Sequence, residues 1–170
     1  MDVYDFALKM ELDGKAYYQK LAEKTRLPGL KNIFLQLAKD EQKHYEIFQG
    51  LKQKGPLDMP ATTVLEEAKN VFEKLTADSS SAALLRDDLA GYLHAMKLEV
   101  ESFRLYEDAA GREPDARIKA LLLNIAGEEQ KHFNVLQNIY DFVNAPNQYL
   151  AWGEFSNLDE FRNFGRDSTI

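Results

Sequence analysis

Asp40-Glu41-Gln42-Lys43-His44 is the stretch that decides the fold, because it recurs as Glu128-Glu129-Gln130-Lys131-His132. Each copy carries a glutamate and a histidine three positions apart, and the copies are displaced by 88 positions (41 to 129, 44 to 132). Side chains three positions apart on an α-helix lie on one face, so both can reach the same point. The pattern predicts two equivalent helices that direct Glu-His pairs toward one centre.

A second pair of glutamates follows the same displacement. Glu11 and Glu99 are 88 positions apart, and each precedes the Glu of its Glu-x-x-His by 30 positions. That distance accommodates the rest of one helix, a short turn and half of the next helix. We therefore predict a duplicated helix hairpin, with halves at about 2–54 and 82–144. Its six inward polar side chains would be Glu11, Glu41, His44, Glu99, Glu129 and His132.

Apolar residues surround these positions in steps of three and four, which is typical of helices packed in a bundle. The clearest segment is 115–144, where every inward position except two is branched and apolar: Ile118, Leu122, Ile125, Leu136, Ile139 and Val143. Glu129 and His132 occupy the two exceptions. Pro28-Gly29 and the region from Gly111 to Pro114 supply the breaks between paired helices. The expected fold class is all-α, a four-helix bundle.

The segment 55–81 has no counterpart inside a tight hairpin. Gly55-Pro56 ends the preceding helix, and Pro60 keeps the next few residues extended. Val64 to Leu75 has the spacing of a short amphipathic helix. We expect this segment to be the crossover that joins the two hairpins, as in four-helix bundles with one long connection.

The bundle domain is expected at 1–145, and an extension follows at 146–170. This extension carries five aromatic residues, namely Tyr149, Trp152, Phe155, Phe161 and Phe164. Such a content is high for a free tail, so we expect it to dock on the bundle or on a second subunit. The second arrangement would make a homodimer.

Composition excludes several classes of protein. A chain of 170 residues is long enough for one domain with a sizeable core, and a net charge of −7 argues against a nucleic-acid partner. The absence of cysteine excludes disulfides, Cys-ligated zinc and iron–sulfur centres. Acidic residues stand near the start, where a signal peptide requires basic ones, and no window approaches the about 18 apolar residues of a membrane span. We expect a cytoplasmic protein without a membrane partner.

Metal binding is the physical reason to bury four carboxylates together. Without counter-charge they would repel one another and raise their pKa values. Two divalent cations would balance the four negative charges, while neutral His44 and His132 would add nitrogen ligands. This mixture of oxygen and imidazole suits iron or manganese better than calcium or zinc. A single Glu-x-x-His would more often be a solvated Glu beside a stray His, and a metal-free helical interaction module is the alternative for the doubled pattern.

With one Glu on each of two helices and Glu-x-x-His on each of the others, the chain resembles the ferritin-like di-iron carboxylate proteins. The duplicated halves, with Ala7-Leu8-Lys9-Met10-Glu11 and the stretch at 40–44, resemble the rubrerythrin branch most. The resemblance covers about residues 2–144. It implies a centre of two iron ions, with manganese or a mixed pair as options. Glu41 and Glu129 would bridge the ions, Glu11 and Glu99 would each hold one ion, and each His would cap one ion.

Two features depart from rubrerythrins. The chain has no cysteine with which to hold their electron-relaying iron domain. Their additional Glu, one turn after the lone Glu of the third helix, is replaced by Ser102, and Gly14 stands at the matching position of the first half. Glu101 points elsewhere on a helix and is a poor substitute. We therefore expect a more symmetric site, with small residues that leave space for an oxidant or allow close helix packing.

Four further residues are candidates for a supporting role around the metals. Asp40 and Glu128 directly precede the expected bridging residues, and the resemblance to the di-iron class implies that an acid there accepts a hydrogen bond from a ligand His. We expect Asp40 to pair with His132, and Glu128 with His44; the alternative is two surface acids. Tyr18 and Tyr106 follow the lone glutamates by seven positions, where they could donate hydrogen bonds or electrons, or simply pack in the core.

The leading functional hypothesis is an oxidoreductase. The resemblance implies reduction of hydrogen peroxide or dioxygen at the di-iron centre, and the lack of cysteine requires electrons from an external donor protein. The alternative is an iron-binding or ferroxidase protein for iron handling or storage. Storage in bulk needs a large hollow shell, which nothing in the sequence indicates.

Overall fold

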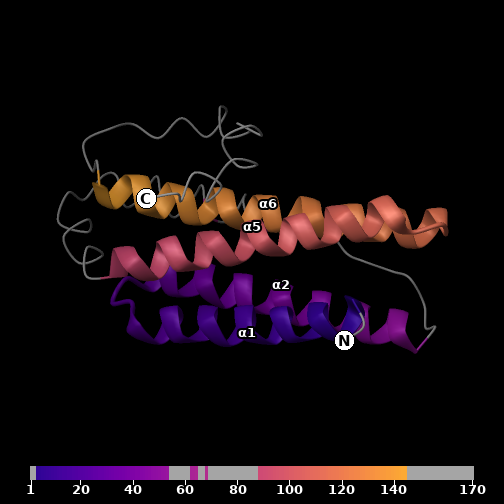
Figure 1. Ribbon diagram of the computed structural model, residues 1–170. Helices are drawn as coiled ribbons and strands as arrows, with labels where there is room; N and C mark the ends of the chain where they lie inside the picture. The colour runs from indigo at the N-terminus through magenta and orange to yellow at the C-terminus, as the bar shows by residue number, and fades with distance from the viewer. Residues whose placement is uncertain (1–2, 54–61, 65–67, 69–87, 145–170) are drawn as a thin grey trace.

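The computed structural model describes residues 3–53, 62–64, 68 and 88–144, and within them four long helices form two hairpins (Figure 1). The first hairpin pairs helix α1 (Val3–Lys24) with α2 (Pro28–Lys52). The second pairs α5 (Leu89–Arg112) with α6 (Ala116–Asn144). This confirms the predicted all-α four-helix bundle.

The two hairpins pack with their corresponding helices antiparallel. Figure 1 shows α1 and α5 on the near side, running in opposite directions, with α2 and α6 behind them. Side-chain contacts agree, because Tyr18 on α1 reaches Glu99 on α5, whereas Tyr106 on α5 reaches Glu11 on α1. The most extensive contacts are within each hairpin, and those between α1 and α5 are fewer. Between the two hairpins, the contacts of α1 with α5 are the most extensive, so this seam is where the hairpins approach each other most closely.

The chain turns between helices at the residues that the sequence marks as breaks, with one correction. Pro28 was expected to lie in the break between the first two helices, but it is the first residue of α2 and follows the extended Leu27. Proline is favoured there because its fixed φ suits a helix and the first-turn N–H groups have no intrahelical acceptor. Asp115 starts α6 by accepting hydrogen bonds from the N–H groups of Arg117 (2.8 Å) and Ile118 (3.4 Å).

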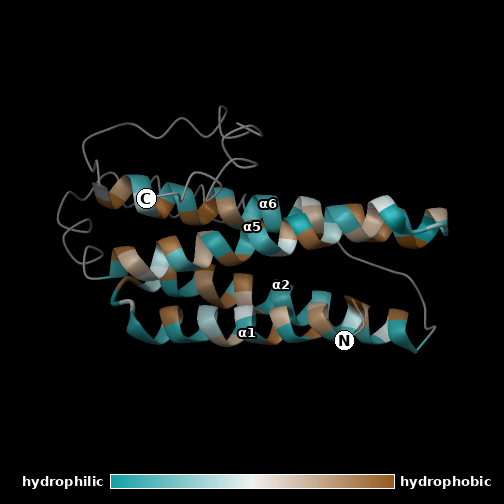
Figure 2. Cartoon of the chain, in the orientation of Figure 1, coloured by the Kyte–Doolittle hydropathy of each residue, from teal (hydrophilic) through white to brown (hydrophobic). Residues whose placement is uncertain are grey.

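Apolar positions of the predicted helix seams form the core. On α2 the buried residues include Leu30, Ile33, Phe34, Leu37, Phe48 and Leu51, which together with Glu41 and His44 recur in steps of three and four. Figure 2 shows brown and teal alternating along every helix, as expected for amphipathic helices in a bundle. Burial of these side chains at roughly 1.5–3 kcal/mol each provides most of the driving force for folding.

Several expectations lie outside the described residues. They are the short helix of the crossover at Val64–Leu75, of which only Val64 and Ala68 are described, the start of the third helix at Ala82, and the aromatic extension at 146–170. Within the described part of the chain, no helix is sufficiently long and apolar to cross a lipid bilayer.

Candidate metal centre

The structure brings together all six inward polar side chains identified in the sequence. They come from the middle of the four helices, where the core would otherwise be apolar. Each is almost completely buried, with between 0% and 4% of its surface exposed: Glu11, Glu41, His44, Glu99, Glu129 and His132. Burial of so many ionisable groups is costly unless something balances their charge.

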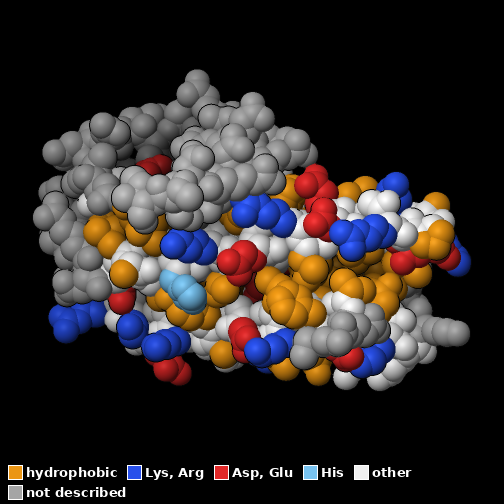
Figure 3. All heavy atoms as spheres, viewed as in Figure 1, with side chains coloured by type: hydrophobic (Ala, Val, Ile, Leu, Met, Phe, Trp, Pro, Cys, Tyr) orange, Lys and Arg blue, Asp and Glu red, His pale blue; other side chains and the backbone are white. Residues whose placement is uncertain are grey.

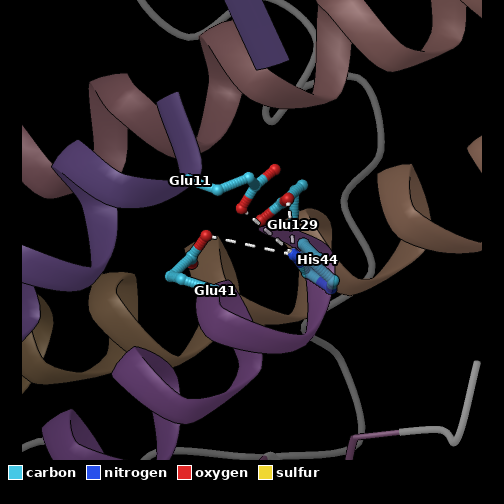
Figure 4. A group of neighbouring side chains, drawn as sticks. All are labelled: Glu11, Glu41, His44 and Glu129. Atoms are coloured by element: carbon cyan, nitrogen blue, oxygen red, sulfur yellow. Dashed lines mark ion pairs between the residues drawn. The ribbon is translucent and has the colours of Figure 1, made fainter. Parts of the chain in front are cut away.

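The first half of the cluster is centred on His44, whose Nδ1 atom faces three carboxylates (Figure 4). This nitrogen lies 3.1 Å from Glu129 Oε1, 3.5 Å from Glu11 Oε2 and 3.9 Å from Glu41 Oε2. One ligand atom from each of the four residues lies within 4.8 Å of the others. Three carboxylate oxygens and one imidazole nitrogen therefore surround a single point.

The second half of the cluster is centred on His132 and repeats the first. Its Nδ1 atom lies 3.1 Å from Glu41 Oε1, 3.2 Å from Glu129 Oε2 and 3.6 Å from Glu99 Oε2. These four residues also offer ligand atoms within 4.8 Å of one another. Glu41 and Glu129 belong to both groups, whereas each remaining Glu and His belongs to one. This is the arrangement that the resemblance implies for two bridging and two terminal carboxylates.

Unsatisfied polar atoms test whether a metal fits this cluster. Among the described residues, buried atoms without a hydrogen-bond partner include both Nδ1 atoms, Glu11 Oε2, Glu41 Oε1 and both carboxylate oxygens of Glu129. Buried polar groups normally have partners, and all of these atoms face the two points described above. Four carboxylates and two imidazoles form a donor set that suits iron or manganese. The residues therefore fit a dinuclear metal centre.

Burial and the neighbouring charges perturb the ionisation of the carboxylates in the metal-free protein. Burial, together with the neighbouring Glu129, Glu11 and Glu99, raises the pKa of Glu41 well above its ordinary value. Burial and Glu129 raise the pKa of Glu99 to about 8, despite the opposing effect of His132. Burial also disfavours the charged form of Glu129, but the two imidazoles outweigh it and lower the pKa of that carboxyl group.

The imidazoles respond in the opposite direction. Burial by itself would lower the pKa of His44, but Glu129 and Glu11 raise it well above its ordinary value. Burial opposes protonation of His132 in the same way, and the neighbouring carboxylates of Asp40, Glu129, Glu41 and Glu99 raise its pKa. Protons on the imidazoles and on part of the carboxylates thus balance the charge when no metal is bound. Cations that enter must displace those protons.

Each imidazole makes a second contact on the side away from the cluster. His44 Nε2 lies 3.0 Å from Glu128 Oε2, and His132 Nε2 lies 3.5 Å from Asp40 Oδ2. Both pairs of residues are those expected from the sequence, but only the first makes the expected hydrogen bond; His132 Nε2 faces Asp40 without a hydrogen-bond partner among the described residues. An acid at Nε2 favours the tautomer in which Nδ1 carries the free lone pair, so it directs Nδ1 toward a metal.

Two tyrosines tie the hairpins together through the carboxylates. The hydroxyl group of Tyr18 donates to Glu99 Oε1, and that of Tyr106 donates to Glu11 Oε1. Burial and the adjacent carboxylates raise the pKa values of both phenols well above the ordinary range, which keeps them protonated as donors. Each tyrosine thus orients the lone Glu of the opposite hairpin.

A pocket of about 180 Å³ reaches the cluster from the seam between α1 and α5. Glu41 and Glu99 line its inner part, together with Gly14 and Ser102. Figure 3 looks onto this side of the bundle, where apolar and charged side chains are interspersed. A Cβ atom built on Gly14 would lie 3.5 Å from the carboxylate of Glu41, so larger side chains at this position would intrude on the space. The two small residues therefore keep an approach to the carboxylates open.

Sequence analysis missed two residues that contact the cluster's supporting acids. Thr62, in the crossover, donates its hydroxyl hydrogen to Asp40 and its backbone N–H to Glu128 Oε1 (2.6 Å). Lys43, which looks like a solvated residue in the sequence, donates to Asp40 Oδ1 at 2.6 Å. The periodic pattern could have placed Lys43 beside Asp40, three positions away, but no local signal reveals where a crossover residue packs.

Comparison with known proteins gives one match. The family model described as rubrerythrin matches residues 2–140. No curated protein and no solved structure shows a significant match to the chain.

Proposed function

Because the chain belongs to the rubrerythrin family, we propose that it is a di-iron oxidoreductase that reduces hydrogen peroxide, or dioxygen, with electrons from an external donor protein. The observation that carries the proposal is the pair of buried ligand groups that share Glu41 and Glu129. Two ions held by common carboxylates would act on one small molecule together.

In this proposal the protein holds the ions and controls what reaches them. Glu41 and Glu129 would contact both ions, Glu11 with His44 would hold one, and Glu99 with His132 would hold the other. Iron bound there would supply the electrons for reduction of the oxidant. Tyr18 and Tyr106 keep the terminal carboxylates oriented from the opposite hairpins. Asp40 and Glu128 fix the imidazoles, so that the ligand geometry is set before a metal binds.

The pocket between α1 and α5 supports a small substrate. Its volume of about 180 Å³ has room for peroxide or dioxygen and a few water molecules, but not for a large organic molecule. Apolar side chains of Phe6, Met10 and Leu98 line it alongside charged ones. A neutral oxidant would therefore pass more readily than a hydrated ion.

Rapid mixing of the Fe(II)-loaded protein with oxidant tests the proposal. Anaerobic protein with two equivalents of iron is mixed with peroxide and, separately, with dioxygen, and oxidation is followed by absorption. We expect peroxide to oxidise the bound iron faster than it oxidises the same iron in buffer, and repeated reduction by an added donor to restore the reaction. Oxidation no faster than that of free iron with both oxidants would refute the enzyme assignment.

The same experiment separates the alternative in iron handling. A ferroxidase would react with dioxygen and then release ferric iron, so that further Fe(II) is consumed without a reductant. A storage protein would in addition form a large shell, which gel filtration with light scattering detects. A small particle that retains about two metal ions per chain would support the oxidoreductase.

A further inference from the structure

Thr62, in the crossover, contacts the acids behind both imidazoles. It is 5% exposed, and it contacts Asp40 and Glu128 on the side of the imidazoles away from the ligand cluster. Its backbone N–H donates to Glu128 Oε1 at 2.6 Å, and its hydroxyl group donates to Asp40 Oδ2. A single residue therefore joins two acids that come from different hairpins.

The two acids lead directly to the imidazoles. Glu128 uses its other oxygen, Oε2, to contact His44 Nε2 at 3.0 Å. Asp40 uses the same oxygen, Oδ2, for Thr62 and for His132 Nε2 at 3.5 Å. The chain of contacts therefore runs from one imidazole through Glu128, Thr62 and Asp40 to the other imidazole.

The local backbone fixes the direction of the threonine hydroxyl. The N–H of Val64 donates to Thr62 Oγ1 at 3.2 Å, which occupies one lone pair and leaves the hydroxyl hydrogen to point toward Asp40. Lys43 and Gln36 hold the other oxygen of Asp40, at 2.6 Å and 3.4 Å from Oδ1. The carboxylate of Asp40 is thus held at both ends, and its Oδ2 atom is presented to His132.

We propose that Thr62 is a positioning residue for the metal centre, whose hydroxyl group serves the His132 half and whose backbone N–H serves the His44 half. The proposal rests on the proposed metal-binding function, but not on the oxidant or on the electron donor. Outer partners of metal ligands typically change metal affinity by about 10–100-fold. Loss of the hydroxyl group should therefore weaken one ion of the pair by that factor and leave the other unchanged.

Calorimetric titration with Co²⁺, which needs no oxidant, tests this division. Wild-type protein should bind two equivalents. Thr62→Val keeps the shape and the backbone N–H but lacks the hydroxyl group, so one equivalent should bind about 10–100-fold more weakly. Thr62→Ser restores the hydroxyl group and should restore the affinity. The double variant Thr62→Val with Asp40→Asn should bind no more weakly than Asp40→Asn alone, because Thr62 acts through Asp40.

The results that would overturn the role of Thr62 differ from those that would refute the oxidoreductase. Wild-type affinity for both ions in Thr62→Val, equal weakening of both, no restoration by serine, or an additive double variant would each overturn the proposal. So would a Thr62→Val protein that does not fold, as judged by circular dichroism, or a wild-type protein that binds no cobalt. A protein that follows the expected pattern but fails to react with peroxide would refute only the oxidoreductase.

Discussion

At the scale of single residues, Glu41 and Glu129 differ from the other ligand candidates because each belongs to both halves of the cluster. A change at either position affects both points at which a cation can be held. A change at Glu11 or Glu99 affects one. Substitution of a shared Glu should therefore weaken metal binding more than substitution of a Glu that belongs to one half, although the side chains are identical.

Replacement of Glu129 by Gln should abolish binding of the metal pair. The amide keeps the size of the side chain but removes a negative charge that both cations need. We expect affinity to fall by more than about 100-fold, the upper end of the range for outer partners, and metal analysis after dialysis should find less than one ion per chain. Glu23→Gln, on an exposed position of α1, is the control and should retain both ions. Retention of two ions by Glu129→Gln would contradict a bridging role.

Tyr106→Phe should destabilise the protein, because it removes the hydrogen bond to the buried carboxylate of Glu11. Hydrogen bonds to charged groups contribute about 1.5–3 kcal/mol, and denaturant unfolding should show a loss of that size. Tyr92→Phe is a matched control, since Tyr92 is also buried and its hydroxyl group has no hydrogen-bond partner among the described residues. It should leave the free energy of unfolding nearly unchanged. Equal losses in the two variants would argue against the contact.

At this scale the spacing of residues was sufficient to predict which side chains meet. Glu and His three positions apart must share a helix face, so the spacing was enough to group the six inward residues. The acid–imidazole pairs were predicted from the resemblance to the di-iron class. Thr62 was not predicted, because its position depends on how the crossover folds back over the bundle. The pKa shifts could not be predicted from the sequence either, because the opposing contributions of burial and neighbouring charges depend on distances.

At the scale of helices, α1 and α5 make the most extensive contact between the two hairpins, and Gly14 and Ser102 stand on the two sides of that seam. The sequence placed both small residues beside the lone glutamates but left open whether they make space or allow close packing. The pocket supports the first interpretation. The start of α2 at Pro28 shows the limit of reading helix ends, because proline both breaks a helix and favours the first position of one.

Enlarging the residues of this seam should slow the reaction without removing the metal. Gly14→Leu or Ser102→Leu would fill part of the pocket, and oxidation of the iron-loaded protein by peroxide should slow by about tenfold or more, or about 1.4 kcal/mol in the barrier. Gly111→Leu, at a position with nothing within 4 Å, is the control and should react as the wild type does. If the seam variants keep both the metal and the full rate, the oxidant approaches by another route.

Gly14→Ala, a smaller change at the same position, should increase the stability of the protein. Its Cβ would make ordinary contact with Glu41 at 3.5 Å, and alanine favours a helix over glycine by about 1 kcal/mol. We expect an increase of up to about that amount in the free energy of unfolding, measured with denaturant. A decrease would mean that the carboxylate of Glu41 cannot tolerate the methyl group.

At the scale of the whole molecule, the metal-free protein should lose stability as pH rises. The folded-state pKa of Glu99 is raised from 4.5 to about 8, so its contribution is fully present below 4.5 and is lost as pH rises through about 8. The raised pKa values of Glu41 and both imidazoles act in the same direction. Thermal unfolding of chelator-treated protein should therefore show a falling Tm over that window.

Metal should remove this dependence. Cations displace the protons that balance the cluster, so binding should release protons and tighten as pH rises. The loaded protein should keep a nearly constant Tm over the same window, and a chelator should lower Tm most at its alkaline end. A metal-free helical module would instead show the same Tm with and without chelator at every pH.

The antiparallel packing of corresponding helices has a consequence for the two halves of the chain. Tyr18 donates a hydrogen bond to Glu99 of the second hairpin, and Tyr106 donates one to Glu11 of the first. Each imidazole also contacts an acid from the opposite hairpin. Neither hairpin contains a finished coordination sphere by itself. A half-length forerunner could have bound its metals only by pairing with an identical copy, and today's chain is the equivalent of that dimer with its two subunits fused end to end.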